Sequence, residues 1–248
     1  MCNLYHVSPK AQIATHFRSI VPDQYDEVAV GPFGTGPFVR SAGDGLECVL
    51  GQWGMIRPGA PARIELKKVK PVPGRKPLAP RPRSTNNARI ETIASKQTFR
   101  DAWRSGKRCL IPAAWYQEPN WETGKNIWWR LQRADGMPWA LAGLWSEWVD
   151  HVTGEVVPNY TMITTNCDGH PLLGRLHKPD LTLPADAQDK RSVIHVDPAY
   201  WQRWLSGGED EALALIRPQP SEVFDLADAR RTDEALAHAQ KTVPQTLL

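Results

Sequence analysis

The chain lacks any apolar run long enough to cross a bilayer, and its first residues lack the basic-then-apolar pattern of a secretory signal. Its four cysteines, Cys2, Cys48, Cys109 and Cys167, show no CxxC spacing, which argues against a disulfide scaffold and a structural zinc site. We therefore expect a soluble, cytoplasmic protein with reduced thiols, no metal, no cofactor and no membrane partner.

Internal repeats and linkers are also missing from the 248 residues, of which 41% are hydrophobic. This length and composition suffice to bury one substantial core. We expect a single domain over residues 1–248, with its core at about residues 2–206 and a divergent, partly flexible C-terminal segment at 207–248. A monomer is expected.

Cap residues and apolar spacing predict the secondary structure. Helices are predicted at 8–20, 95–105, 198–205 and, weakly, 233–240, with Ser8 and Asp197 as N-caps and Gly106 as a stop. Strands are predicted at 108–111, 126–131, 139–145, 160–165 and 192–196. Strands separated by turns and few helices indicate an α+β fold, a single domain on a largely antiparallel, barrel-like β-sheet with flanking helices.

Acidic residues are scarce between Arg57 and Arg89, where Glu65 is the single acid among ten basic residues. Such a patch suits phosphates. The same stretch is rich in proline, which forbids regular structure and favours a solvated, flexible loop. The two interpretations are compatible, because a mobile basic loop can border a nucleic-acid groove.

Cys2 carries the strongest chemical signal. Removal of Met1 would expose an α-amine and a thiol on adjacent carbons, and about a tenth of such an amine is unprotonated at neutral pH. The amine can condense with an aldehyde to an imine, and the thiol can then close a thiazolidine. The alternative is that the thiol is merely a small hydrophobe.

Three further segments accompany Cys2. Residues 86–92 read Asn-Asn-Ala-Arg-Ile-Glu-Thr, residues 108–113 read Arg-Cys-Leu-Ile-Pro-Ala, and residues 176–179 read Leu-His-Lys-Pro. Singly, each has an ordinary explanation as a turn, a solvated carboxylate or a core histidine. Together, in this order and with a Glu nine positions after Cys109, they resemble the SOS-response-associated peptidase (SRAP) family over residues 1–205.

The resemblance implies a function and a role for each matched residue. Family members crosslink covalently to abasic sites in single-stranded DNA and thereby shield the lesion. Cys2 would be the mature N-terminus and the crosslinking nucleophile, and Asn87 would hold its amine or the opened sugar. Glu118 would shuttle protons, His177 would be the second acid/base, and Arg89 would clamp a phosphate. The chain would then be a crosslinking enzyme with abasic-site lyase and autopeptidase activity, nucleoid-associated when bound to DNA.

The expected DNA contacts are three basic residues, two aromatic residues and a threonine: Arg57, Arg89, Arg191, Trp53, Trp115 and Thr165. This chain departs from the family pattern at several places, and Gly59-Ala60 replaces an aromatic residue that normally stacks on a base. Leu4 stands where many members have Arg, and Ala114-Trp115 replaces an Asp-Gly pair. The chain is thus similar to a divergent member, in which Trp115 or Trp121 is expected to supply a base-stacking surface.

Two other classes of function stay open on the sequence. One is a cysteine peptidase or amidohydrolase that uses Cys2 and His177 and removes its own Met1. The other is a module that binds single-stranded DNA without a covalent step. For the crosslinking enzyme, we expect His177 to titrate near its unperturbed pKa of about 6.5 and Glu118 to set the acidic limb of the rate profile.

Overall fold

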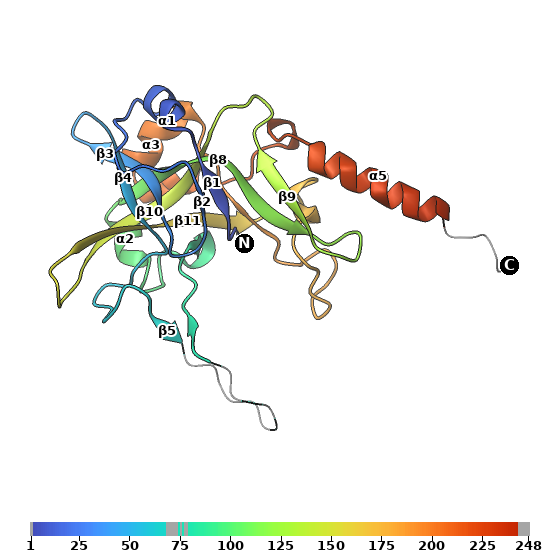
Figure 1. Cartoon of the computed structure of the whole chain (residues 1–248), viewed down its shortest axis with the longest axis horizontal. Coiled ribbons are helices and arrows are strands. Elements are labelled where there is room, and N and C mark those ends of the chain that lie inside the picture. The colour runs from blue at the N-terminus through green and yellow to red at the C-terminus, as the bar shows by residue number, and fades with distance from the viewer. Residues whose placement is uncertain (1, 68–73, 75, 77–78, 243–248) are drawn as a thin grey trace.

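The chain folds mainly into strands with a few short helices, which confirms the predicted α+β class (Figure 1). The computed structural model describes residues 2–67, 74, 76 and 79–242. The strands are β1 (Tyr5–Val7), β2 (Ala29–Val30), β3 (Thr35–Ala42), β4 (Gly45–Trp53), β5 (Leu66–Lys67), β6 (Arg81–Pro82), β7 (Asn87–Arg89), β8 (Arg108–Asn120), β9 (Ile127–Gln132), β10 (Trp139–Val149), β11 (Val156–Asn166) and β12 (Arg191–Val193). The helices are α1 (Lys10–His16), α2 (Arg100–Arg104), α3 (Trp201–Ser206), α4 (Glu209–Leu213) and α5 (Ala227–Thr242), with 3₁₀ turns η1 (Ile90–Thr92), η2 (Leu173–Arg175), η3 (Pro198–Tyr200) and η4 (Ser221–Val223).

A closed barrel forms the centre of the molecule. Its strands follow the order β10, β11, β4, β3 and β8, and a further pairing between β8 and β10 closes the ring. These pairings are antiparallel except for β11 with β4. Closure removes the unpaired edges that an open sheet would leave. The prediction of a largely antiparallel, barrel-like sheet is therefore confirmed.

Strand β8 connects the barrel to the site described below. Its first half, up to Ala113, pairs with β10 inside the barrel, and its second half, from Trp115, pairs with β9 outside the barrel. β1 runs along the same part of β8, with Tyr5 opposite Tyr116. The first residues of the chain therefore lie against the segment that carries Glu118.

One hydrophobic core fills the barrel and continues beneath its helices. The strands pack so closely that a Cβ atom on Gly143 would lie 2.4 Å from Ile111 Cδ1 and 2.6 Å from the carbonyl oxygen of Thr161. Glycine is required there because β10 lies between β8 and β11 without room for a side chain. No helix in the described ranges is long and apolar enough to cross a membrane.

The predicted helices differ from the observed ones mainly at their ends. The first was predicted over 8–20, but α1 begins at Lys10 after Pro9, and Arg18 adopts a left-handed conformation that stops it. The second, predicted over 95–105, is helical only from Arg100 to Arg104, because residues 95–99 form turns. The Asp197 cap is confirmed, since its carboxylate accepts the backbone N–H of Ala199 at 3.0 Å.

The C-terminal segment is more ordered than expected. The buried core extends beyond residue 206 and includes Ala212, Leu215, Phe224 and Ala229. Helix α5 begins at Ala227 instead of 233, and Figure 1 shows it extending away from the barrel beyond β9. The expected flexible end at 243–248 lies outside the described residues.

The proline-rich basic stretch also holds a short ladder that its composition did not predict. β5 and β6 pair antiparallel, with Leu66 opposite Pro82 and Lys67 opposite Arg81. Both strands are only two residues long and exposed, and proline is tolerated at such an edge. Lys68, Lys70 and Arg75 of the predicted patch lie outside the described residues.

Candidate active site

Cys2 is held in place through its carbonyl group. The side-chain amides of two consecutive asparagines donate to this one oxygen, Asn86 from 3.1 Å and Asn87 from 2.7 Å. Both asparagines are buried, as is Cys2. Asn87 was predicted to hold the Cys2 amine or the opened sugar; here its amide binds the Cys2 carbonyl, and the predicted role stays a prediction. Asn86 was missed, although it stands beside Asn87 in the same motif.

Strand β7 supplies the rigid support for these amides. It runs parallel to β11, with Asn87 opposite Met162. The carbonyl oxygen of Asn86 accepts the indole N–H of Trp53 at 2.8 Å and the backbone N–H of Met162 at 3.0 Å. The Asn87 Oδ1 atom is buried and accepts no hydrogen bond from any described residue. A buried acceptor of this kind is costly unless a partner uses it.

The Cys2 thiol is kept in its neutral form. Burial raises its pKa well above the ordinary value, and the negative charge of Glu118 raises the pKa further. Its Sγ atom lies 3.4 Å from the carbonyl oxygen of Leu4. The thiol is therefore a proton carrier at neutral pH and reacts only as its proton is removed.

Glu118 lies on β8 between two backbone hydrogen bonds to other segments of the chain. The backbone N–H of Gln117 donates to the carbonyl oxygen of Leu4 at 3.0 Å. The backbone N–H of His177 donates to the carbonyl oxygen of Pro119 at 2.6 Å. The Glu118 side chain is completely buried, and burial raises its pKa to about 7. A carboxyl group with a pKa near neutral pH can donate or accept a proton there.

His177 faces Glu118 with one ring nitrogen and is anchored by the other. Its Nε2 atom donates to the carbonyl oxygen of Arg191 at 2.8 Å, and its Nδ1 atom lies 3.7 Å from Glu118 Oε2. A carbonyl oxygen can only accept, so the hydrogen is on Nε2 and the Nδ1 lone pair points to Glu118. The backbone of His177 is left-handed, with φ of 62°. The turn that orients the ring is therefore conformationally costly.

The titration expected for His177 is wrong. Burial lowers its pKa to about 4, so the ring is neutral throughout the physiological range. The group that titrates near neutral pH is instead Glu118. Each buried group shifts toward its uncharged form, which reverses the order predicted from the unperturbed values.

A network of ion pairs fixes the backbone that holds His177. The guanidinium of Arg191 is buried and forms two hydrogen bonds with Glu91, at 2.9 and 2.6 Å, and one with Asp189 at 3.2 Å. The Lys190 ammonium donates to the carbonyl oxygen of His177 at 2.7 Å. Paired, planar contacts of this kind are strong and directional. Glu91, from the Asn-Ala-Arg-Ile-Glu-Thr motif, thus holds Arg191, whose carbonyl oxygen accepts the His177 ring N–H. Sequence spacing does not reveal this link.

A cavity of about 460 Å³ lies beside His177. Its walls include Trp121, Leu181 and Lys190. The ammonium of Lys178 lies 5.0 Å from the centroid of the Trp121 ring, which is a cation–π contact. His177 therefore borders a space whose wall combines apolar side chains with charges of both signs, because Glu122 and Asp180 line it together with Lys190.

The three arginines predicted to contact DNA have different environments. Arg89 is half exposed and pairs with Asp189 at 2.7 Å. Arg57 forms two hydrogen bonds with Glu65, at 3.1 and 2.8 Å. Arg191 is 4% exposed. The Arg191 guanidinium is occupied within the protein, so the prediction that it contacts DNA does not fit its position.

The other residues predicted to contact DNA also differ in how deeply they are buried. Trp53 is completely buried and its indole N–H donates to Asn86, so it is a core residue that cannot stack on a base. Trp115 and Trp121 are half buried, and Thr165 is partly exposed on β11. Contacts of these three residues with DNA stay predictions.

Replacement of Arg89 is expected to weaken the salt dependence of DNA binding. Each phosphate neutralised on a single strand contributes about −0.7 to the slope of log affinity against log salt. Because Arg89 is the half-exposed member of the predicted set, Arg89→Gln should flatten the slope by about 0.7. Arg57→Gln, at a less exposed guanidinium held by two hydrogen bonds to Glu65, is the matched control. Equal slopes for wild type and Arg89→Gln would give Arg89 a structural role.

Replacement of Glu118 is expected to stabilise the fold at alkaline pH. Its folded pKa of about 7 lies above the unfolded value, so its contribution to stability is present at low pH and is lost as pH rises through 7. Glu118→Gln removes this ionisation and should gain about 3 kcal/mol over wild type above pH 8, with little gain at pH 4. Urea unfolding at both pH values measures the difference, with the exposed Glu155→Gln as control. A difference independent of pH would contradict the assigned shift.

One known protein family matches most of the chain. The model of the family described as SOS response associated peptidase (SRAP) matches residues 1–232. The chain belongs to the SRAP family. Membership supports a DNA-damage-associated function, abasic-site processing and binding of DNA. No curated protein matches the sequence.

Solved structures show how widely the SRAP fold tolerates sequence change. A crystal structure of a protein from Bordetella bronchiseptica is 27% identical, covers 90% of this chain and 97% of its own, and superposes with a TM-score of 0.74. A protein from Bacteroides thetaiotaomicron, at 21% identity and 90% coverage of both chains, gives 0.67. A phage-related protein from Bordetella bronchiseptica, at 14% identity and 90% and 92% coverage, gives 0.58. The last two comparisons concern the fold alone.

Proposed function

We propose that this protein crosslinks itself to abasic sites in single-stranded DNA through a thiazolidine formed by Cys2, after removal of Met1. One observation carries the proposal. Two asparagine amides hold the Cys2 carbonyl beside a buried carboxyl group and imidazole that face each other at 3.7 Å. A fixed nucleophile next to an acid/base pair is the arrangement that carbonyl condensation needs.

The reaction proceeds in two stages. The unprotonated α-amine of Cys2 attacks the aldehyde carbon of the opened deoxyribose, and the resulting carbinolamine loses one water to give an imine. The thiol sulfur then adds to the imine carbon, and its proton passes to the imine nitrogen. No oxidant or cofactor is needed, because one water leaves and no electrons are gained or lost.

The buried groups divide the proton transfers. Glu118, with a pKa of about 7, can protonate the leaving hydroxyl and then take the proton of the Cys2 thiol. The neutral Nδ1 atom of His177 can accept a proton during opening of the sugar ring. Asn87 Oδ1 offers an acceptor to the mature amine or to a sugar hydroxyl. The cavity beside His177 offers room for the DNA next to the lesion.

The same imine has a second fate. Its C2′ proton is acidic, so a base can remove it while the 3′ phosphate leaves. A β-lyase side activity therefore follows when the thiol fails to close the ring. Addition of the sulfur to the imine carbon prevents this elimination and protects the strand.

The electrostatics disfavour a cysteine peptidase as the alternative. Such enzymes use a thiolate, because a nearby imidazolium or helix N-terminus lowers the pKa of the cysteine thiol. Here burial and Glu118 raise the pKa of Cys2, and burial lowers that of His177. A non-covalent DNA-binding module, in turn, would leave the buried Glu118–His177 pair without a use.

Denaturing electrophoresis and peptide analysis test the proposal. Mature protein is mixed with an abasic single-stranded oligonucleotide, an undamaged oligonucleotide of the same sequence, and peptides. A heat-stable adduct with abasic DNA alone is expected. A cut peptide without an adduct would favour a peptidase, and binding without either product would favour the non-covalent module. A monomer acting in the cytoplasm, at the nucleoid when bound to DNA, completes the proposal.

A further inference from the structure

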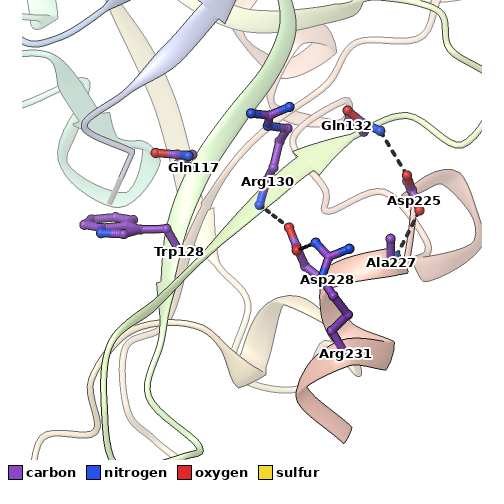
Figure 2. Close-up of a pocket in the computed structure, with 8 residues that line it drawn as sticks. All are labelled: Gln117, Trp128, Arg130, Gln132, Asp225, Ala227, Asp228 and Arg231. Atoms are coloured by element: carbon purple, nitrogen blue, oxygen red, sulfur yellow. Dashed lines mark hydrogen bonds and ion pairs between the residues drawn. The ribbon is translucent and has the colours of Figure 1, made fainter. Parts of the chain in front are cut away.

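The hairpin of β8 and β9 has a second polar face, opposite to Glu118. Glu118 pairs in register with Trp129, and both side chains are buried. Because side chains alternate along a strand, Gln117, Trp128 and Arg130 point to the other face. Figure 2 shows these three side chains together in one pocket. The pocket and the candidate active site are therefore separated by the thickness of one hairpin.

The pocket has a volume of about 460 Å³. Strands β8 and β9 form one wall, and the start of α5 forms the other (Figure 2). Helix α5 is fixed there by Asp228, whose carboxylate accepts the backbone N–H of Arg130 at 2.6 Å. The Trp129 indole also donates to Thr232 at 3.0 Å. The wall contributed by α5 is therefore held against β9 by hydrogen bonds from two of its residues.

Arg130 is the cation of the pocket that has no internal counter-ion. Its guanidinium carbon lies 4.5 Å from the centroid of the Trp115 ring, which is a cation–π contact. Within the described part of the chain, no carboxylate pairs with this guanidinium. Arg231, in contrast, is paired with Asp228 in the same pocket. The Arg130 side chain is exposed, so its N–H donors are accessible to an anion.

Trp128 supplies an aromatic surface beside this cation. Its side chain is 51% exposed, so one face of the indole is accessible to a ligand. The Gln117 amide, on the neighbouring strand, offers both a donor and an acceptor (Figure 2). An aromatic face, an amide and an unpaired arginine are the three elements that bind a base and its phosphate.

We propose that this pocket binds a nucleotide of the DNA strand that flanks the lesion. The base stacks on Trp128, its edge meets the Gln117 amide, and its phosphate pairs with Arg130. The strand reaches the pocket from the active site over the exposed hairpin tip at residues 121–126. This inference rests on the proposed function, because it makes the pocket an extension of the same DNA-binding path.

Binding measurements on two oligonucleotides test the inference. Both carry a reduced, unreactive abasic site; one has long flanks and the other has one nucleotide on each side. Trp128→Ala should lower affinity for the long strand about 5- to 150-fold, the range for loss of one stacked base, and should leave the short one unchanged. Arg130→Gln should flatten the salt slope on the long strand by about 0.7.

Matched variants and a competitor sharpen the result. Trp128→Phe keeps an aromatic face and should retain most of the affinity, and Arg231→Gln should leave the salt slope unchanged. A free deoxynucleoside monophosphate should compete poorly, because it lacks the rest of the strand. Unchanged affinity in Trp128→Ala, equal losses on both oligonucleotides, or displacement by the mononucleotide at equal affinity would each overturn the inference. Thermal unfolding confirms that each variant is folded.

The two proposals fail in distinguishable ways. If the wild-type protein forms the adduct but replacement of Trp128 and Arg130 does not change DNA affinity, the crosslinking proposal stands and the pocket proposal is wrong. If the wild-type protein forms no adduct but its affinity for single strands depends on both residues, the pocket proposal stands and the crosslinking proposal is wrong.

Discussion

A Cys2→Ala variant is expected to form no heat-stable adduct with abasic single-stranded DNA while binding the same DNA non-covalently. The reason is that ring closure needs the thiol on the carbon next to the amine. The variant keeps its carbonyl, so the hydrogen bonds from Asn86 and Asn87 that fix the N-terminal segment remain possible. Adduct yield on a denaturing gel and affinity by fluorescence polarisation measure the two properties separately.

A second cysteine provides the control for this experiment. Cys48 is buried on β4, outside the site, and Cys48→Ala should crosslink at the wild-type yield. Borohydride should trap an imine in Cys2→Ala, because its amine is intact. A heat-stable adduct in Cys2→Ala at wild-type yield, without borohydride, would exclude the thiazolidine.

Glu118→Gln is expected to slow adduct formation by about 10²- to 10⁴-fold, the usual contribution of a general acid/base. The carboxyl group has a pKa of about 7, so the wild-type rate should change across neutral pH and the variant should lose this titration. His177→Ala should retain the titration, because the histidine pKa of about 4 places its own change in acid. Single-turnover rates between pH 4 and 9 measure both effects, with Glu155→Gln as the control.

A pre-opened aldehyde substrate separates the two roles. If His177 mainly opens the sugar ring, this substrate should restore the rate of His177→Ala and leave Glu118→Gln slow. Equal restoration of both variants, or of neither, would contradict this division. Loss of a neutral titration in His177→Ala but not in Glu118→Gln would contradict the assigned pKa values.

The sequence predicted the fold class because its apolar strands are long and regular. The run around Trp139 and the run around Tyr160 became adjacent barrel strands, each extended by several residues. The hairpin of β3 and β4 was not predicted, because glycine, proline and charged residues interrupt its apolar positions. The end of α1 depends on the left-handed conformation of Arg18, which only the tertiary context imposes.

The site was predictable to the extent that its residues stand in motifs. Cys2, Asn87, Glu118 and His177 were all chosen from the sequence, and the structure brings them together. Their protonation states were not predictable, since the pKa shifts come from burial. Likewise, Arg191 and Trp53 carry the right chemistry for DNA binding but are buried. Exposure, which decides between a contact and a core residue, is not encoded in residue type.

The mass of the intact adduct tests the central claim most directly. The purified protein is mixed with abasic single-stranded DNA, with and without borohydride, and the mass of the adduct is measured by mass spectrometry. We expect the mass of the protein without Met1 plus that of the DNA minus one water, unchanged by borohydride, because a thiazolidine has no C=N bond to reduce. A gain of two hydrogens would show an imine that never closes, and an adduct that retains Met1 would contradict the role of the Cys2 amine.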